Sequence, residues 1–323
     1  KKFIRFGLNQ DNGSAQTDCF ILEKDGSIIA PIDWDYEQIT EAIARPIDDK
    51  SLLIRGGIFT TIANQAESVY NYYSRGIDII RSNTIVDGVT HYVVGEGKNG
   101  SPYRGFINVM DCANVTVQNC FVTGHKIYVT IGAANKPVMM GSYDLHANSV
   151  VNFTIRNCRM NHINDRTRWG VFASNFCKNI IMEDCILSRI DAHMGVSGIY
   201  AVRNSELGWQ GINAIGRGEL ILERVTLHGR NLLSLRADYG STWEGNVRIT
   251  DCKWVLSDYE QEVSYIIGMY NNGMHDFGYT CYMPETIEIE NLYIDDSALA
   301  QKKHDIYLFS DPCAGDDKES LPP

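Results

Sequence analysis

The chain has 323 residues, 44% of them hydrophobic, which is enough apolar sequence for one large core. Its formal net charge of −11 disfavours general binding to nucleic acid or to an anionic membrane surface. No stretch approaches about eighteen consecutive apolar residues, so we predict no membrane insertion.

Both ends of the chain differ from its middle. The opening KKFIRFGLNQ has neither an initiating Met nor an apolar signal region, so we expect a trimmed product of a secreted, periplasmic or cell-surface protein. Residues 33–48, DWDYEQITEAIARPID, have helix-like spacing. We predict that residues 1–50 cap the N-terminal end of the fold or form irregular first coils. The acidic residues 311–323 are predicted to form a frayed tail.

Between these ends a short sequence repeat recurs. The best copies show Asn, alternating apolar residues, Asn or Asp, Cys, and a second apolar alternation, and period-two alternation predicts short strands. The copies are IDIIRSNTIVDG from Ile77, NVTVQNCFVTG from Asn114, NFTIRNCRMNH from Asn152, NIIMEDCILSR from Asn179, ELILERVTLHG from Glu219, NVRITDCKWVL from Asn246 and TIEIENLYIDD from Thr286.

The spacing of the cysteines gives the length of each coil. From Cys120 to Cys252, and counting weaker copies near Ser205 and Val225, the successive spacings are 38, 27, 20, 20 and 27 residues. Coils of this length are typical of solenoids, whereas a β-sandwich does not place one residue type repeatedly at one rung position. We therefore predict an all-β fold, a single right-handed parallel β-helix that spans residues 1–323.

Stacked coils bring like side chains together, because neighbouring strands lie about 4.8 Å apart. The Cys of each repeat is predicted to join a buried structural ladder. The Asn or Asp before it is predicted to lie in a turn, where its side chain satisfies backbone groups. Cys112 and Cys177 are predicted to stack on another face. The ladder thiols are Cys120, Cys158, Cys185 and Cys252, and the turn residues are Asn119, Asn157, Asp184 and Asp251.

The Asn-Cys ladder and the variable coil lengths resemble the pectate-lyase-like superfamily of right-handed β-helices. The segments FGLNQDNGSAQTD, GGIFTTIANQ and IVDGVTHYVVGEG resemble secreted β-helix proteins of gut Bacteroidetes, some of which are labelled IgA1 protease. The resemblance covers nearly the whole chain for the fold, but none of its motifs is specific to one enzyme. No serine-protease motif is present, and the segment from Arg189 to His193 departs from the pectate-lyase Trp-Ile-Asp-His strand. We predict neither a metal nor a cofactor.

Two aspartates occupy comparable positions after the ladder. Asp165 follows its Cys by seven residues and Asp191 by six, so on neighbouring rungs they are predicted to lie about 5 Å apart. Such a pair suits a glycosidase, in which one carboxyl protonates the leaving oxygen and the other acts as nucleophile or base. The structural alternative is that each caps a turn or pairs with a neighbouring Arg such as Arg166. The same region also carries Arg168, Trp169, Arg189 and His193.

Two further segments contain reactive side chains. In LRADYGSTWEG, Arg236 and Tyr239 suit β-elimination on an acidic sugar, and aromatic residues there alternatively close the edge of a coil. In SYDLHAN, an Asp and a His two positions apart are predicted to share a face. The candidates added by these segments are Asp144, His146, Asp238 and Trp243, with Trp209 and Trp169 as further platforms for sugar rings.

We therefore expect a carbohydrate-active protein that acts on an anionic polysaccharide. Hydrolysis by Asp165 and Asp191 is favoured, with Arg168, Arg189 and Arg236 holding carboxylates or sulfates. Eleven of the twelve cations between residues 156 and 248 are Arg.

Two alternatives stay open. One is a lyase in which Arg236 neutralises the uronate and Tyr239 or His193 transfers protons. The other is a non-catalytic glycan-binding module or adhesin, because a β-helix needs none of this chemistry in order to fold.

Overall fold

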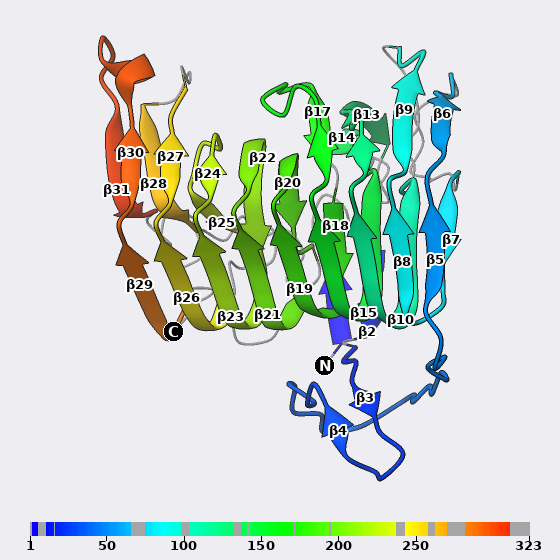
Figure 1. Ribbon diagram of the computed structural model, residues 1–323. Coiled ribbons are helices and arrows are strands. Elements are labelled where there is room, and N and C mark those ends of the chain that lie inside the picture. The colour runs from blue at the N-terminus through cyan, green and yellow to red at the C-terminus, as the bar shows by residue number, and fades with distance from the viewer. Residues whose placement is uncertain are drawn as a thin grey trace.

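The computed structural model describes residues 2–5, 11–15, 17–65, 75–97, 104–131, 137–140, 143–170, 172–193, 195–236, 243–257, 262–269 and 282–310. These residues form an all-β coil built on two long sheets (Figure 1). Each coil contributes strands to both sheets, and every pairing within the two sheets is parallel. The predicted parallel β-helix is therefore confirmed.

The first sheet contains the longer strands, and β7 and β18 pair with the first parts of β10 and β15. Its strands are β5 (Leu52–Arg55), β7 (Ile77–Ile79), β8 (Thr84–Asp87), β10 (Ile107–Gln118), β15 (Leu145–Arg156), β18 (Phe172–Asn175), β19 (Cys177–Glu183), β21 (Val196–Arg203), β23 (Gly216–Glu223), β26 (Trp243–Thr250) and β29 (Thr286–Glu290).

The second sheet follows a tight turn in each coil. Its strands are β6 (Ile58–Ile62), β9 (Thr90–Val94), β11 (Phe121–Val122), β16 (Arg159–Met160), β20 (Ile186–Asp191), β22 (Glu206–Ala214), β24 (Thr226–Leu227), β25 (Leu233–Leu235), β27 (Lys253–Val255), β28 (Val263–Gly268), β30 (Tyr293–Asp295) and β31 (Asp305–Phe309).

Small antiparallel pairs leave the coil. They are β1 (Lys2–Arg5) with β2 (Asp11–Ala15), β3 (Ile21–Leu22) with β4 (Ile28–Ile29), β12 (His125–Lys126) with β17 (Arg168–Gly170), and β13 (Tyr128–Ile131) with β14 (Pro137–Met140). In the described part of the chain the one helical element is η3 (Ser297–Leu299), and no helix there is long and apolar enough to span a membrane.

The coil lengths agree with the cysteine spacing. Hydrogen bonds between equivalent positions of neighbouring coils join residues 38, 27, 20, 20, 27 and finally 40 positions apart. Ser205 takes the place of Cys in a short coil, and its hydroxyl accepts a hydrogen bond from the Cys185 amide at 3.0 Å. The buried Val225 takes the place of Cys in the next coil. The two weak copies are therefore genuine rungs.

The turn before each ladder cysteine depends on a left-handed backbone. Asn119, Asn157, Asp184 and Asp251 have φ between 49° and 55°, a region in which Asn and Asp are enriched. Three of these side chains bond to the equivalent turn of a neighbouring coil: Asn157 donates to the Asn119 side chain at 2.7 Å, Asn119 donates to Asp87, and Asp251 accepts from Asn291. The prediction that these side chains satisfy backbone groups is wrong for this pair, because stacked amides satisfy each other.

Inside the coil, rows of apolar side chains fill the core. One row contains Val117, Ile155, Met182, Val202 and Leu222, which pair in register and are at most 1% exposed. Burying each such side chain contributes about 1.5–3 kcal/mol relative to leaving it exposed. The ladder cysteines are also buried, and burial raises the pKa of Cys252, which fits a structural rather than a reactive thiol.

Residues 17–50, the longest described stretch before β5, form neither a cap nor a coil. Residues 33–48 contain no helix in the structure, and Ile39 and Ile43 are 72% and 66% exposed, so the apolar spacing meets no surface on which to pack. Residues 17–50 instead run along the side of the coils as a strap (Figure 1). Ion pairs attach this strap to several coils, and they include Asp18–Lys178, Arg45–Asp111 and Asp48–Arg81. The tail at 311–323 lies outside the described residues.

The most deeply buried of these three ion pairs is formed by Lys178. Lys178 is 2% exposed in its side chain, and its Nζ lies 2.7 Å from Asp18 Oδ1 and 2.9 Å from Asp33 Oδ2. Replacing Lys178 with Met should leave Asp18 buried without its charge partner, at a cost of about 3–5 kcal/mol. We expect proteases to cleave residues 17–50 faster, while the thermal unfolding of the coils changes little. Arg248→Met, which breaks an exposed ion pair, is the control, and an unchanged cleavage rate in Lys178→Met would contradict the role of this lysine.

Candidate functional site

A row of polar side chains crosses the coils where strands of the second sheet end and strands of the first begin. Register pairs Asp78 with Asn108 and Asn108 with His146, and Ala173 follows on the next rung. A bridge between Ser174 and Ala192 continues the row to Asp191, which pairs with Asn213. Residues far apart in sequence therefore lie on successive rungs about 4.8 Å apart.

Asp191 is the charged centre of this row. Its side chain is fully buried, and it forms ion pairs with Arg189 at 2.8 Å and with Arg236 at 2.7 Å. The Tyr143 hydroxyl donates to Asp191 Oδ2 at 3.3 Å. Burial alone raises the pKa of Asp191, but the charges of Arg189 and Arg236 outweigh it and lower the pKa to about 2. Asp191 is therefore a carboxylate held between two guanidinium groups.

The groups around Asp191 are less deeply buried than Asp191 itself. Tyr143 and His193 are half-buried, and the Arg236 side chain is 13% exposed. The Arg189 guanidinium lies 5.8 Å from the centre of the Tyr143 ring. Two Arg charges and one Asp charge leave this cluster with a net charge of +1, which suits a carboxylate-bearing ligand.

His146 lies two rungs from Asp191. Its Nδ1 lies 2.7 Å from Asn108 Oδ1, whose amide nitrogen donates to Asp78 at 3.0 Å. Burial, with a smaller effect from Arg104, lowers the pKa of His146 to about 4. His146 is therefore neutral near pH 7, and it contributes a hydrogen bond rather than a positive charge.

Asp144 belongs to a second buried network. Its Oδ1 lies 2.6 Å from His91 Nδ1, and its Oδ2 accepts a hydrogen bond from the Gly124 amide at 2.6 Å. Arg168 donates to the Gly124 carbonyl at 2.5 Å, and it lies 3.6 Å from Glu96. Asp144 and His146, although two residues apart, therefore bond to different partners.

The predicted juxtaposition of Asp165 and Asp191 on neighbouring rungs is wrong. Asp165 lies in a turn between β16 and β17, where it accepts hydrogen bonds from the Thr167 amide and hydroxyl at 2.9 and 2.7 Å. Its Oδ2 also pairs with Arg168 at 3.4 Å. Burial raises the pKa of Asp165, but the Thr167 hydrogen bonds and the Arg168 charge produce a net lowering. This turn is an insertion into the coil, so counting from the cysteines misplaces it.

The predicted aromatic platforms have different surroundings. Trp243 is fully buried in the core and donates to the Gly218 carbonyl at 3.2 Å, so its predicted contact with a sugar ring is wrong. Trp209 is half-buried and stacks under the Arg166 guanidinium at 4.0 Å. Trp169 lies in β17, but its side chain is outside the described residues, and so are Asp238 and Tyr239.

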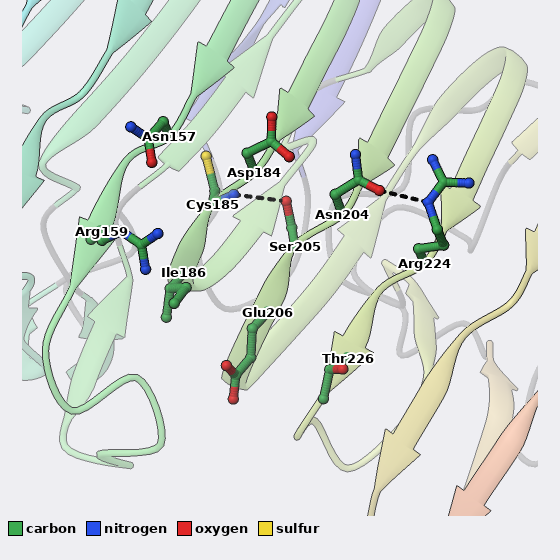
Figure 2. A pocket seen from close by; sticks show the side chains of 10 residues that line it. All are labelled: Asn157, Arg159, Asp184, Cys185, Ile186, Asn204, Ser205, Glu206, Arg224 and Thr226. Atoms are coloured by element: carbon green, nitrogen blue, oxygen red, sulfur yellow. Dashed lines mark hydrogen bonds between the residues drawn. The ribbon is translucent and has the colours of Figure 1, made fainter.

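An open groove of about 430 Å³ lies elsewhere, at the tight turn between the two sheets (Figure 2). It crosses four coils and contains two carboxylates and two guanidinium groups. None of the predicted site residues whose side chains the structure describes lines it. The lining residues are Asn157, Arg159, Asp184, Cys185, Ile186, Asn204, Ser205, Glu206, Arg224 and Thr226.

Sequence inspection missed Asn108, Asn213, His91 and Glu96 as members of these networks. A usable signal existed for Asn108, which lies 38 residues before His146, the same spacing that separates Asn119 from Asn157. For the other three, the coil lengths alone do not show which side chains turn toward one another. Among the described residues, no group of three or more His, Cys, Asp or Glu side chains is placed to hold a metal ion.

Comparisons with known proteins give one partial match. No protein-family profile and no solved structure matches the chain. A capsule KL64-specific depolymerase of Klebsiella phage P510 is 32% identical over 121 residues, which are 34% of this chain and 12% of that protein. The chain therefore spans a small part of the length of this relative. The resemblance to Bacteroidetes β-helix proteins stays a prediction.

The charge state of Asp191 makes stability depend on pH. Its pKa in the folded chain, about 2, lies below the ordinary value of 3.8, so ionised Asp191 stabilises the fold above pH 3.8. We expect this contribution to disappear as the pH falls from about 4 to about 2. In Asp191→Asn, unfolding followed by circular dichroism should show lower stability at pH 7 and a shallower decline over this window. Asp49→Asn, at an exposed position, is the control, and equal slopes for Asp191→Asn and the parent chain would contradict the assignment.

Proposed function

We propose that this chain binds and cleaves a polysaccharide outside the cell, as a depolymerase of surface glycans. The partial match to a phage capsule depolymerase is the observation that carries this proposal. The parallel β-helix supports it, because the stacked coils form an extended surface along which a polymer chain can lie.

The substrate is an acidic polysaccharide that contacts the row around Asp191. The net charge of +1 among Asp191, Arg189 and Arg236 favours a sugar carboxylate over a neutral ring. Asp191 does not contact the substrate itself and holds both guanidinium groups in place. Arg236, the more exposed of the two, then binds the uronate carboxylate.

Of the two reaction classes, the geometry favours β-elimination over hydrolysis by paired carboxyls. A carboxyl with a pKa of about 2 has no proton to donate near pH 7, and Asp165 is bound to its own turn. Elimination needs a group that neutralises the uronate, a base that removes the proton beside it, and an acid for the leaving oxygen. Arg236 supplies the first role, and Tyr143 and His193 are the candidates for proton transfer.

Recognition without catalysis is the second candidate function. The described carboxylates Asp165 and Asp191 are both paired with Arg, and the hollow at the tight turn is an open groove rather than an enclosed cleft. Both features suit a module that binds a glycan along its surface.

Product analysis separates these possibilities. The chain is incubated with a panel of uronate-containing, neutral and sulfated polysaccharides. We expect the uronate-containing ones to release products that show the ultraviolet absorbance of unsaturated uronates. Reducing ends without such absorbance would instead support hydrolysis. Binding without any product would support the recognition module, and neither binding nor product on any acidic polymer would contradict the proposal.

Substitutions test the roles within the cluster. Tyr143→Phe removes the hydroxyl but keeps the ring, and Arg236→Gln removes the positive charge. We expect each to lower kcat/KM by about 10²-fold or more, with Tyr143→Phe acting on kcat and Arg236→Gln acting also on KM. Asp165→Asn, at the inserted turn, should stay within about threefold of the parent chain. Loss of activity in Asp165→Asn with retention in Tyr143→Phe would restore the paired-carboxyl hypothesis.

A further inference from the structure

A chain of hydrogen bonds joins an Asp, a His and a Thr at the first coils. Asp144 Oδ1 lies 2.6 Å from His91 Nδ1, and His91 Nε2 lies 2.8 Å from Thr61 Oγ1. The three residues come from different coils, because Thr61 lies in β6, His91 lies in β9 and Asp144 immediately precedes β15. None of the roles proposed above for the Asp191 cluster uses this chain.

The hydrogen bonds fix how the protons are arranged. Asp144 is fully buried, and although burial raises its pKa, the His91 hydrogen bond and nearby charges outweigh it and lower the pKa. An ionised Asp144 accepts a hydrogen bond from His91 Nδ1–H, which leaves Nε2 as the acceptor for the Thr61 hydroxyl. The His91 ring is held in this orientation by stacking on Phe106, with ring centres 3.8 Å apart. This is the arrangement of nucleophile, base and orienting carboxylate used in acyl transfer.

Thr61 is also reachable. It is half-buried, and its strand β6 ends the second sheet, with β9 as its one partner in the described residues. The side chain of Phe59, two residues earlier on the same face of β6, is 40% exposed. A small substrate can therefore approach Thr61 from the N-terminal end of the solenoid.

The edge of β6 supplies hydrogen-bond donors beside Thr61. The Ala63 amide donates to Val94 in β9, so in a parallel pair the alternate amides of β6, including that of Ile62, point away from β9. The amide that follows a nucleophile is a frequent donor to the oxyanion of acyl transfer. The partly exposed Phe59 side chain provides an apolar surface on the Thr61 face of this edge, which suits a short acyl group.

We propose that Thr61, His91 and Asp144 form a separate esterase site that removes short acyl groups, such as acetyl, from hydroxyl groups. That these esters are carried by a polysaccharide rests on the function proposed above, whereas the esterase chemistry does not. Thr61 Oγ attacks the ester carbonyl while its proton passes to His91 Nε2, and His91 then protonates the departing alkoxide. Water, deprotonated by His91, hydrolyses the acyl-threonine to a carboxylate and restores the hydroxyl.

The test uses the full chain with p-nitrophenyl acetate and with O-acetylated polysaccharide, measuring nitrophenolate and acetate. Thr61→Val replaces the hydroxyl with a methyl group of similar size, and we expect it to lose about 10³-fold or more in kcat/KM. Thr61→Ser keeps a hydroxyl and should stay within about tenfold of the parent chain. Thr60→Val, at the exposed neighbouring position, is the matched control and should leave the rate unchanged.

A second measurement keeps the proposal testable if Thr61→Val folds poorly. Labelling of the parent chain with a fluorophosphonate, followed by peptide mass spectrometry, should place the label on Thr61 and should require His91. No acetate release by the parent chain, or equal release by Thr61→Val and the parent chain, would overturn the esterase site. Cleavage of the polysaccharide backbone is measured separately. Backbone cleavage without acetate release would contradict the esterase site, and acetate release without backbone cleavage would contradict the proposed depolymerase.

Discussion

The parallel pairing of each coil with the next is the interaction on which the rest of the structure depends. At the turn before the ladder position, residues such as Asn119, Asn157 and Asp184 adopt a left-handed backbone, and stacked amides bond across the rungs. A one-residue slip would move core side chains to the outside, so this turn fixes the register of both sheets. Residues 20 to 40 positions apart therefore become neighbours about 4.8 Å apart.

The same constraint decides where the chain can vary. The turns at the ladder position carry no extra strands in the described coils, whereas the passage from the second sheet to the first carries β12–β14 and β17. These excursions bring residues to the buried networks, because Arg168 of β17 donates to the Gly124 carbonyl and the Gly124 amide donates to Asp144. A buried carboxylate needs a charged or hydrogen-bonding partner, which explains why Asp191 is found with two arginines and Asp144 with a histidine.

This division also explains what the sequence could predict. The ladder cysteines and Asn119-type turns repeat at fixed rung positions, so strand order and coil length followed from spacing, even where Ser205 replaced Cys. Asp165 could not be placed in this way, because the excursion that contains it shifts the count. Residues 33–48 have the spacing of an amphipathic helix, but such a helix needs a surface to bury its apolar face, and sequence periodicity does not reveal one. Trp243 was misplaced because its indole packs into the core.

The two buried carboxylates lead to different chemistry because their partners differ. Arg189 and Arg236 pair with Asp191 at 2.8 and 2.7 Å, so the Asp191 cluster presents two guanidinium groups and acts by holding an anion in place. His91 lies between Asp144 and Thr61, with its two ring nitrogens 2.6 and 2.8 Å from their oxygens, so its imidazole is placed to pass a proton to and from Thr61. A carboxylate clamped by guanidinium groups is suited to binding and charge neutralisation. A carboxylate that orients an imidazole is suited to activating a hydroxyl. Because the solenoid buries both carboxylates, the two kinds of site can lie within a few coils of each other.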